Sequence, residues 1–439
     1  MAAPSHPSHP SQPSQPSRPP LPPAPAPGRM NVDYEERVDF ARLRGYRLDR
    51  AKQAMEAAGL GALLVFDNNN IRYLTAVSIG EWTRDKLCRY ALYTRTGELV
   101  LWDFGSAAVH HRMYCPWLKP ENCVASYTTM RGASPPASGL TAKQVAEITD
   151  RLAQAGVAGE PVGVDWAEVP TIFELMKAGV QIRDGQQVML DAREIKSRDE
   201  ITLLATAAAM VDGTYAEIAT ALKPGVRENE IVALANKRLY DMGSDDVESI
   251  NAVSGERCNP HPHNFSDRMI RPGEQAFFDI MHSYNGYRTC YYRCFAVGEA
   301  TEPQKDAYRK AREWMDAAID AIKPGVSTDQ VARLWPRAEE FGLADEKTAF
   351  GLQFGHGLGL ALHERPIISR LVSLDAPMEI KEGMVFAVET YCPATDGRSA
   401  ARIEEEVVVG RDGLEILTKF PARELYVTNP YLCRITATP

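Results

Sequence analysis

The segment Arg271-Pro-Gly-Glu-Gln-Ala-Phe-Phe-Asp279 recurs 110 residues later as Lys381-Glu-Gly-Met-Val-Phe-Ala-Val-Glu389. Each copy is a basic, glycine-containing turn that leads into an apolar strand ending in a carboxylate. A second pair, Leu222-Lys-Pro-Gly-Val226 and Ile322-Lys-Pro-Gly-Val326, is offset by 100 residues and marks a helix end, a turn and a new helix start. The two offsets predict an internal duplication with a small insertion, in which Asp279 and Glu389 occupy equivalent places.

Each predicted half has a further strand shortly after its carboxylate, at 286–297 and at 399–409. The second of these strands presents Glu404 on an alternation of apolar and polar residues. Two duplicated sheets that meet along an axis would bring these carboxylates into one cleft. On these short segments alone, a chance match of common turns is the alternative, and the histidine motifs described below favour duplication.

The rest of the chain predicts a tail and a first domain. Residues 1–28 contain eleven prolines, so a tail over residues 1–30 is predicted to be disordered and dispensable. Helix and strand patterns alternate from residue 33 to about 193, which predicts an N-terminal α/β domain over residues 31–195. A long helix from Glu200 to Leu222, with Ser197 as its N-cap, opens a C-terminal domain predicted over residues 196–428.

Composition narrows the class of partner. The 439 residues carry a formal net charge of -9, which favours a small-molecule substrate over nucleic acid or an anionic membrane. The sequence has no apolar run long enough to span a membrane and no signal-peptide pattern, so a cytoplasmic protein is expected. The eight cysteines show no C-x-x-C spacing, which disfavours a structural zinc site and a disulfide framework.

The most informative motif is Gly355-His356-Gly357-Leu358-Gly359, followed by His363-Glu364-Arg365-Pro366. Glycines around a histidine let the backbone approach closely and open space for a ligand. Together with Asp279, Glu389 and Glu404, His356 forms an oxygen-rich set with one imidazole. Such a set suits Mn²⁺, Fe²⁺, Co²⁺ or Zn²⁺ rather than a metal selected by thiolate, and a divalent ion would relieve repulsion among the carboxylates.

With these motifs in place, the chain resembles the methionine aminopeptidase/prolidase/creatinase family. The landmarks are the segment 193–201, the Lys-Pro-Gly repeats, Ser254-Gly255 with Pro262-His263-Asn264, the Gly-His-Gly motif and Arg402-Ile-Glu-Glu405. The resemblance implies an α/β (α+β) protein, with a creatinase-like N-terminal domain and a C-terminal pita-bread domain that has an internal pseudo-two-fold duplication. It implies metal ligation by Asp279, His356, Glu389 and Glu404.

The family's second aspartate ligand is replaced by Cys290 in Gly286-Tyr-Arg-Thr-Cys290. The thiolate could bind one metal, or Cys290 could be an inert filler beside an ion held by His356, Glu389 and Glu404. A third alternative is a metal-free site as in creatinase, although Tyr292 stands in place of creatinase's active-site glutamate. Because the other ligands are retained, one ion per chain is expected.

Further roles also follow from the resemblance. His263 and His363 match histidines that contact substrate and move protons, and Glu389 is expected to act with them in catalysis. Arg402 would orient Glu404 or an acidic substrate group. The N-terminal half is similar to the dimethylsulfoniopropionate lyases of this fold, and a homodimer is implied, in which Trp82 and Arg84 would contact substrate.

The leading prediction is a metal-dependent hydrolase that cleaves a C–N bond in a small zwitterionic compound, such as an Xaa-Pro dipeptide. The alternatives are a metal-dependent lyase of the dimethylsulfoniopropionate-cleaving type and a metal-independent hydrolase resembling creatinase. A pita-bread protein that binds a ligand or partner without catalysis is the remaining alternative. Fold alone does not distinguish among these functions.

Overall fold

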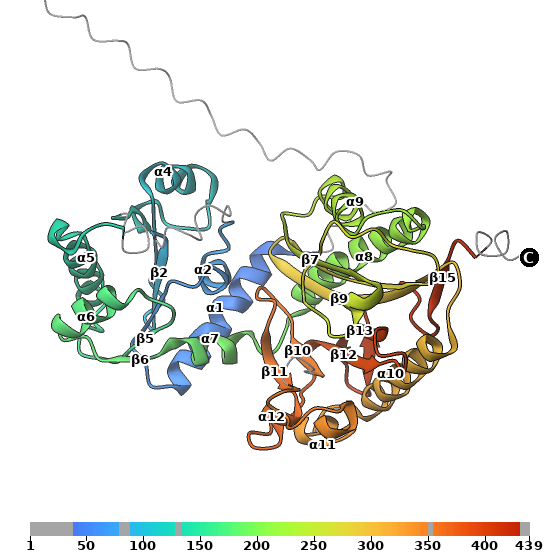
Figure 1. Cartoon of the computed structure of the whole chain (residues 1–439). Helices are drawn as coiled ribbons and strands as arrows, with labels where there is room; N and C mark the ends of the chain where they lie inside the picture. Colours follow the sequence, from blue (N-terminus) through green and yellow to red (C-terminus); the bar gives the residue numbers. More distant parts are fainter. Residues whose placement is uncertain (1–37, 79–87, 128–132, 350–353, 431–439) are drawn as a thin grey trace, which may run out of the picture. The chain divides into compact units, whose positions relative to one another are not determined.

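The computed structural model describes residues 38–78, 88–127, 133–349 and 354–430, which all belong to one compact unit. The predicted tail over residues 1–30 lies outside the described residues. Three β-sheets, each with helices packed against it, make up this unit (Figure 1). None of the helices in the described ranges has the length and apolar character that a membrane span needs.

The N-terminal half contains a six-stranded sheet in the order β4-β3-β2-β1-β5-β6. Its strands are β1 (Ala62–Val65), β2 (Tyr90–Thr94), β3 (Leu99–Asp103), β4 (Cys123–Ala125), β5 (Val162–Val164) and β6 (Ile182–Asp184). Its helices are α1 (Phe40–Ala57), α2 (Asn68–Thr75), α4 (Gly105–Tyr114), α5 (Leu140–Gln154), α6 (Val169–Lys177) and α7 (Gly185–Arg193), with short 3-10 turns at Pro120–Asn122 and Pro136–Ser138.

Helix α1 begins at Phe40, directly after its N-cap. Asp39 caps its N-terminus, because its side chain accepts hydrogen bonds from the backbone N–H groups of Ala41 and Arg42. Inside the sheet, the Tyr90 ring stacks on both Phe66 and Trp102.

The C-terminal half opens with α8 (Arg198–Ala221), where Ser197 is the N-cap, as predicted, and also forms a capping box with Glu200. Helix α9 (Glu228–Asp241) follows. A four-stranded sheet in the order β15-β9-β8-β7 is built from β7 (Asp246–Ser254), β8 (Gln275–Tyr284), β9 (Tyr287–Val297) and β15 (Tyr426–Thr428). A 3-10 turn at Gly255–Cys258 follows β7.

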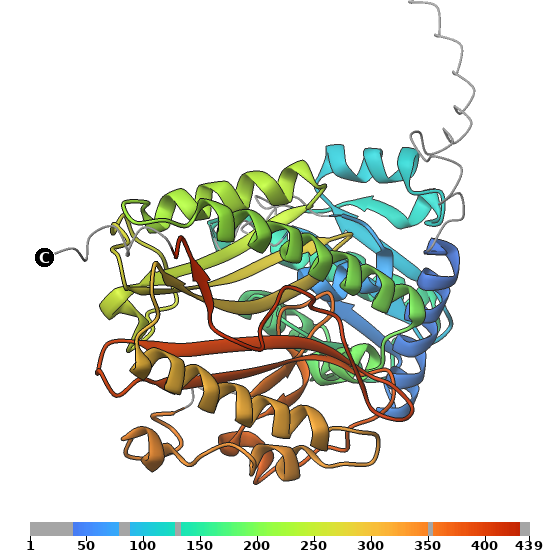
Figure 2. The ribbon, with the colours of Figure 1, turned by 90° about the vertical axis from the view of Figure 1, so that its right-hand side faces the viewer.

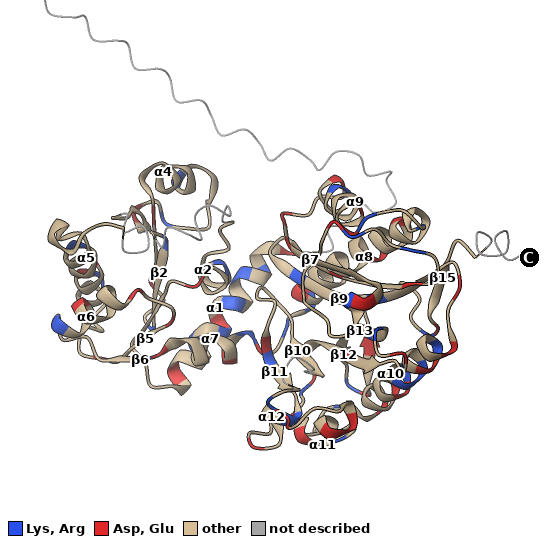
Figure 3. Cartoon of the chain, viewed as in Figure 1, with Lys and Arg blue, Asp and Glu red and all other residues tan. Residues whose placement is uncertain are grey.

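The third sheet has five strands in the order β11-β10-β12-β13-β14. Three elements precede this sheet in the chain, namely α10 (Glu302–Ala321), α11 (Thr328–Ala332) and a 3-10 turn (Ala338–Phe341). Helix α12 (Arg370–Ser373) connects β11 to β12. The strands are β10 (Gly355–Gly357), β11 (Glu364–Ile368), β12 (Val385–Pro393), β13 (Ala400–Val409) and β14 (Leu414–Ile416). Basic and acidic residues both occur along α10, as Figure 3 shows, and Lys305 pairs with Glu302 at 2.8 Å.

The predicted duplication is visible in equivalent backbone hydrogen bonds. In the first half, the Gly225 N–H donates to the Ile270 carbonyl at 2.9 Å, and in the second half the Gly325 N–H donates to the Ile380 carbonyl at 2.9 Å. Each bond ties a Lys-Pro-Gly turn to the residue just before the basic turn that starts the next strand. Strands β9 and β13, one from each half, lie side by side where the two sheets meet (Figure 2).

One detail of the strand prediction was wrong. Asp279 and Glu389 do not end their strands, because β8 continues to Tyr284 and β12 to Pro393. The residues beyond each carboxylate keep pairing with β9 and β13 respectively, so the ladder extends past it. Both carboxylates therefore lie in the middle of a sheet, where neighbouring strands surround them.

Candidate metal and substrate site

A cavity of about 440 Å³ lies in the C-terminal half. A pocket of this size suits a small molecule rather than a polymer. Most of the side chains singled out from the sequence line it, namely His263, Asp279, Cys290, His356, His363, Glu389 and Arg402. Glu404 is fully buried and lies beside Cys290 and His356.

The pairing of β8 with β9 explains why one side of the cavity contains these residues. Asp279 is paired with Tyr292 and Met281 with Cys290. Paired residues in an antiparallel ladder share a face, as do residues two apart along a strand. All four side chains therefore point into the cavity, and Asn251 on β7, which is opposite Asp279, joins them.

The pairing of β12 with β13 places two glutamates opposite each other, Glu389 and Glu404. Like charges directly opposite on a sheet repel, and both side chains are buried. Arg402, on the same face of β13, forms a short ion pair with Glu389. The guanidinium therefore compensates the charge of Glu389. One of the two roles predicted for Arg402 was to orient Glu404, and the ion pair is with Glu389 instead.

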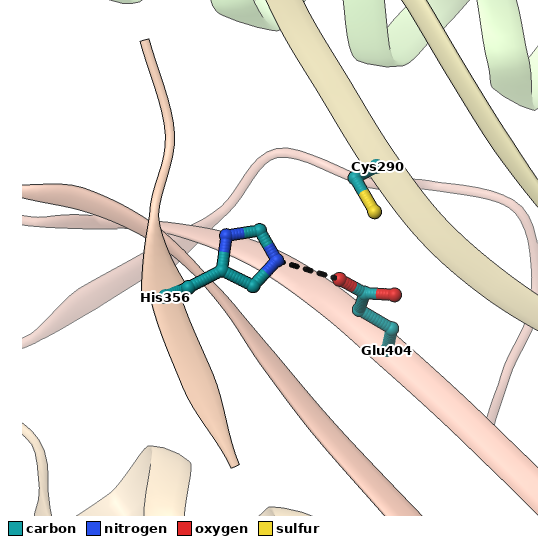
Figure 4. Close-up of side chains that lie close together, drawn as sticks. All are labelled: Cys290, His356 and Glu404. Carbon is teal, nitrogen blue, oxygen red and sulfur yellow. Dashed lines mark ion pairs between the residues drawn. The ribbon is translucent and has the colours of Figure 1, made fainter. Parts of the chain in front are cut away.

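His356 lies on β10 with its Nδ1 3.1 Å from the Gly357 carbonyl. A hydrogen bond from Nδ1–H to this carbonyl leaves Nε2 free to bind a ligand. Burial lowers the pKa of His356 to about 4, so the imidazole is neutral at pH 7. Its Nε2 lies 3.8 Å from Glu404 Oε1 (Figure 4).

Of the two effects predicted for the glycines beside His356, the structure shows the close approach of the backbone. A Cβ at Gly355 would lie 2.8 Å from the Ala387 carbonyl oxygen, and a Cβ at Gly357 would overlap the Arg365 carbonyl. These glycines let β10 fit between β11 and β12. They position the histidine by close packing of backbones, and not by opening space for a ligand.

The other two predicted histidines are also neutral. Burial and the charge of Arg402 lower the pKa of His263, and burial lowers that of His363 to about 4. The His363 ring centroid is 4.4 Å from that of His356. The His263 ring lies 3.9 Å from His261, whose Nε2 is 2.9 Å from the Tyr292 hydroxyl. At pH 7 each neutral ring has an unprotonated nitrogen that can accept a hydrogen bond.

Three buried donors could hold a metal ion. Ligand atoms of Cys290, His356 and Glu404 all lie within 4.8 Å of one another. Among the described residues, neither Glu404 oxygen has a hydrogen-bond partner. Burial, together with the charges of Glu389 and Asp279, raises the pKa of Glu404 well above its usual value. A buried carboxylate without partners needs a proton or a cation, so this site fits a divalent ion.

Asp279 differs from Glu404 in having partners. It accepts hydrogen bonds from Asn251 Nδ2 at 3.0 Å and from Cys290 Sγ at 3.4 Å. Burial and the charge of Glu389 nevertheless raise the pKa of Asp279 to about 6. The cavity therefore holds carboxyl groups that readily exchange protons for a cation.

Trp82 and Arg84, predicted to contact substrate, lie outside the described residues. Sequence reasoning missed Ser249, Asn251, Met281 and Leu362, which also line the cavity, and it had noted Tyr292 only as a replacement for glutamate. The sequence feature that could have indicated Asn251 is its position on β7, the strand that precedes the one carrying Asp279. Nothing local in the sequence says which residues of two strands face each other.

Comparisons with known proteins identify the family. Residues 202–411 match the family described as Metallopeptidase family M24, and residues 47–195 match the Creatinase/Prolidase N-terminal domain. The sequence is 32% identical over 279 residues to the Probable dipeptidase PepE of Mycobacterium tuberculosis (strain ATCC 25618 / H37Rv), over 62% of this chain and 72% of that protein. The chain belongs to metallopeptidase family M24.

Relatives of this M24 chain include more than one activity. The dimethylsulfoniopropionate lyase DddP of Roseovarius nubinhibens is 26% identical over 399 residues, or 87% of each chain. The Xaa-Pro dipeptidase of Pyrococcus furiosus is 28% identical over 269 residues, which are 59% of this chain and 74% of that one.

A solved structure extends the match to nearly the whole M24 chain. The crystal structure of dipeptidase PepE from Mycobacterium ulcerans superimposes with a TM-score of 0.69 at 25% identity, and covers 90% of this chain and 100% of its own. The predicted architecture, a creatinase-like N-terminal domain followed by a pita-bread domain, is confirmed.

Proposed function

We propose that this chain is a metal-dependent hydrolase that cleaves the C–N bond of a small Xaa-Pro dipeptide. The observation that carries the proposal is the buried group of Asp279, His356 and Glu389, which line one small cavity together with Arg402, while Glu404 lies buried beside His356. M24 membership and the named dipeptidase relatives support the same chemistry. A dipeptide is also of a size that a cavity of about 440 Å³ accepts.

The charges in the cavity match a zwitterion. Arg402 is buried, and its Nε has no hydrogen-bond partner among the described residues, so it can donate to a substrate carboxylate. Asp279 and Glu389 line the same cavity and can accept hydrogen bonds from a substrate ammonium group. An Xaa-Pro dipeptide carries both groups.

The neutral histidines supply proton transfer. His363 and His263 line the cavity, and burial lowers their pKa values, so at pH 7 each is a neutral ring that can accept a hydrogen bond from a reacting water or from the substrate. A bound substrate or reaction intermediate that favours the charged ring would let either histidine pass a proton to the leaving nitrogen. Glu389, which is ion-paired with Arg402, is the carboxylate placed to orient a reacting water. A bound divalent ion would polarise the scissile carbonyl and lower the pKa of water.

One ion per chain is part of the proposal, with Mn²⁺, Fe²⁺, Co²⁺ and Zn²⁺ as the candidates. His356 and Glu404 are the donors best placed to hold it, since Nε2 and Oε1 are 3.8 Å apart and both glutamate oxygens lack partners among the described residues. The residues present therefore fit the metal that the family implies.

The lyase is the second candidate, because the similarity to DddP spans 87% of both chains and not only the C-terminal half. In that reaction a cavity base would remove an α-proton while the substrate carboxylate is held. Arg402 and a neutral histidine could serve these roles as well as those of hydrolysis.

The test is a substrate panel with the full chain, loaded in turn with each candidate ion. Release of proline from Xaa-Pro dipeptides, without cleavage of matched Xaa-Ala dipeptides, is the expected result. Release of dimethyl sulfide from dimethylsulfoniopropionate, with no proline release, would replace the hydrolase by the lyase. Turnover that is unchanged after complete metal removal would refute metal dependence and favour a creatinase-like reaction.

We also propose that the protein is a cytoplasmic homodimer in which Trp82 and Arg84 contact the substrate. The boundary between its two domains is proposed to lie between residues 195 and 196. The boundary is supported by the family matches, which end at 195 and resume at 202. A reducing compartment is supported by six buried cysteines that form no disulfide, namely Cys115, Cys123, Cys258, Cys290, Cys294 and Cys392. Sedimentation of the purified chain tests the dimer.

A further inference from the structure

Cys290 lies on β9 with its thiol in the buried cluster of Figure 4. Its Sγ faces His356 of β10 and Glu404 of β13, and one ligand atom from each of the three residues falls within 4.8 Å of the others. The cluster therefore joins strands from both halves of the duplication. Throughout the described ranges it is the one set of three potential ligands gathered this closely.

The other two carboxylates of the cavity are already engaged. Glu389 is ion-paired with Arg402, and both side chains are at most 5% exposed. Asp279 accepts from Asn251 at 3.0 Å and from the Cys290 thiol at 3.4 Å. Both Glu404 oxygens, by contrast, are buried without a partner among the described residues. The carboxylate that lacks a partner is therefore Glu404, which lies beside the Cys290 thiol.

We propose that Cys290 is a metal ligand, and that a single thiophilic divalent ion such as Zn²⁺ binds between Cys290, His356 and Glu404 while Arg402 keeps Glu389 off the metal. The inference rests on the metal site of the proposed function and names its ligands and its metal class. Zinc accepts sulfur, nitrogen and oxygen donors, and three protein ligands leave a fourth position for water or substrate. A thiolate also disfavours Mn²⁺, which prefers oxygen ligands.

Coordination replaces the S–H bond of Cys290 by a sulfur–metal bond and releases one proton, with no change of oxidation state. Asp279 Oδ1 already accepts this S–H at 3.4 Å and lies on the path of the departing proton. The alternative, an ion bound by His356, Glu389 and Glu404 with an inert thiol, would make Glu389 share its charge between the metal and the buried guanidinium of Arg402. Binding through Cys290 leaves this ion pair undisturbed.

Cobalt reports this bond directly, because a cobalt–thiolate pair has a charge-transfer absorption in the near ultraviolet. The metal-free full chain is titrated with Co²⁺, and the expected result is one ion per chain accompanied by this band. Cys290→Ser should abolish the band and weaken Zn²⁺ binding by about tenfold or more. Cys258→Ser, at another fully buried cysteine outside the cluster, is the matched control and should keep the band.

Saturation with cobalt without the band, or a band that persists in Cys290→Ser, would overturn the inference. The wild-type titration decides the matter even if the serine variant does not fold. Cys290→Asp should lose the band and raise the affinity for Mn²⁺ relative to Zn²⁺ by about tenfold, and an unchanged preference would count against ligation. A chain that shows the band but cleaves no dipeptide would refute the proposed function and leave this inference standing.

Discussion

Replacing Glu364 by glutamine should strongly lower the free energy of unfolding, although Glu364 lies at the first position of the short strand β11. Glu364 is 1% exposed and is approached by Arg193 Nε at 3.3 Å and Lys196 Nζ at 3.0 Å, both also buried. Glu364→Gln would leave two buried cations without a counter-charge. Removing one partner of a buried ion pair costs about 3–5 kcal/mol, and that is the expected loss of unfolding free energy.

The effect should also reach the site. Glu364 accepts a hydrogen bond from the Ala361 N–H at 3.0 Å, and it follows His363 directly, so it fixes the turn that carries this histidine. Urea unfolding followed by circular dichroism measures the stability, and kcat on an identified substrate measures the positioning. Glu364→Asp keeps the charge and should lose less stability than Glu364→Gln.

Two comparisons make this prediction refutable. Glu302→Gln removes a carboxylate from an exposed pair with Lys305 at 2.8 Å and should change stability hardly at all, since water screens that pair. Although burial opposes it, the charges of Lys196 and Arg193 hold the pKa of Glu364 below 4.5. The difference in unfolding free energy between wild type and Glu364→Gln should therefore reach its full value above about pH 4.5 and become smaller as pH falls. Equal losses in the two glutamine variants, or no loss at Glu364, would refute the reasoning.

Three further predictions concern the cavity. His356→Ala should remove the bound metal and lower turnover by orders of magnitude with little change in melting temperature. Retained metal with a stability loss of about 1–3 kcal/mol would instead make His356 structural. Metal affinity should rise with pH, because burial raises the pKa values of the proposed ligands Glu404 and Cys290 well above their usual values and binding must displace their protons; calorimetry in buffers of different ionisation enthalpy counts these protons. Arg402→Met should raise KM for a dipeptide more than it lowers kcat, and an unchanged KM would show that Arg402 serves Glu389 alone.

The sequence by itself determined the order of the elements and the duplication. Local signals suffice for both, because a capping residue such as Ser197 or a Lys-Pro-Gly turn acts within a few residues of its own position. The equivalence of Asp279 and Glu389 followed from two repeat offsets, and the structure places both in the middle of strands that border one cavity.

Only the tertiary structure decided how the site residues are paired. The sequence placed Cys290 among the candidate ligands but left open whether it binds metal, and it did not indicate that Arg402 contacts Glu389 or that Asn251 contacts Asp279. These contacts depend on the register between strands and on how closely β9 approaches β13. Register and sheet contact are set by packing between segments more than 100 residues apart, and a side chain's burial and charge partners follow from that packing.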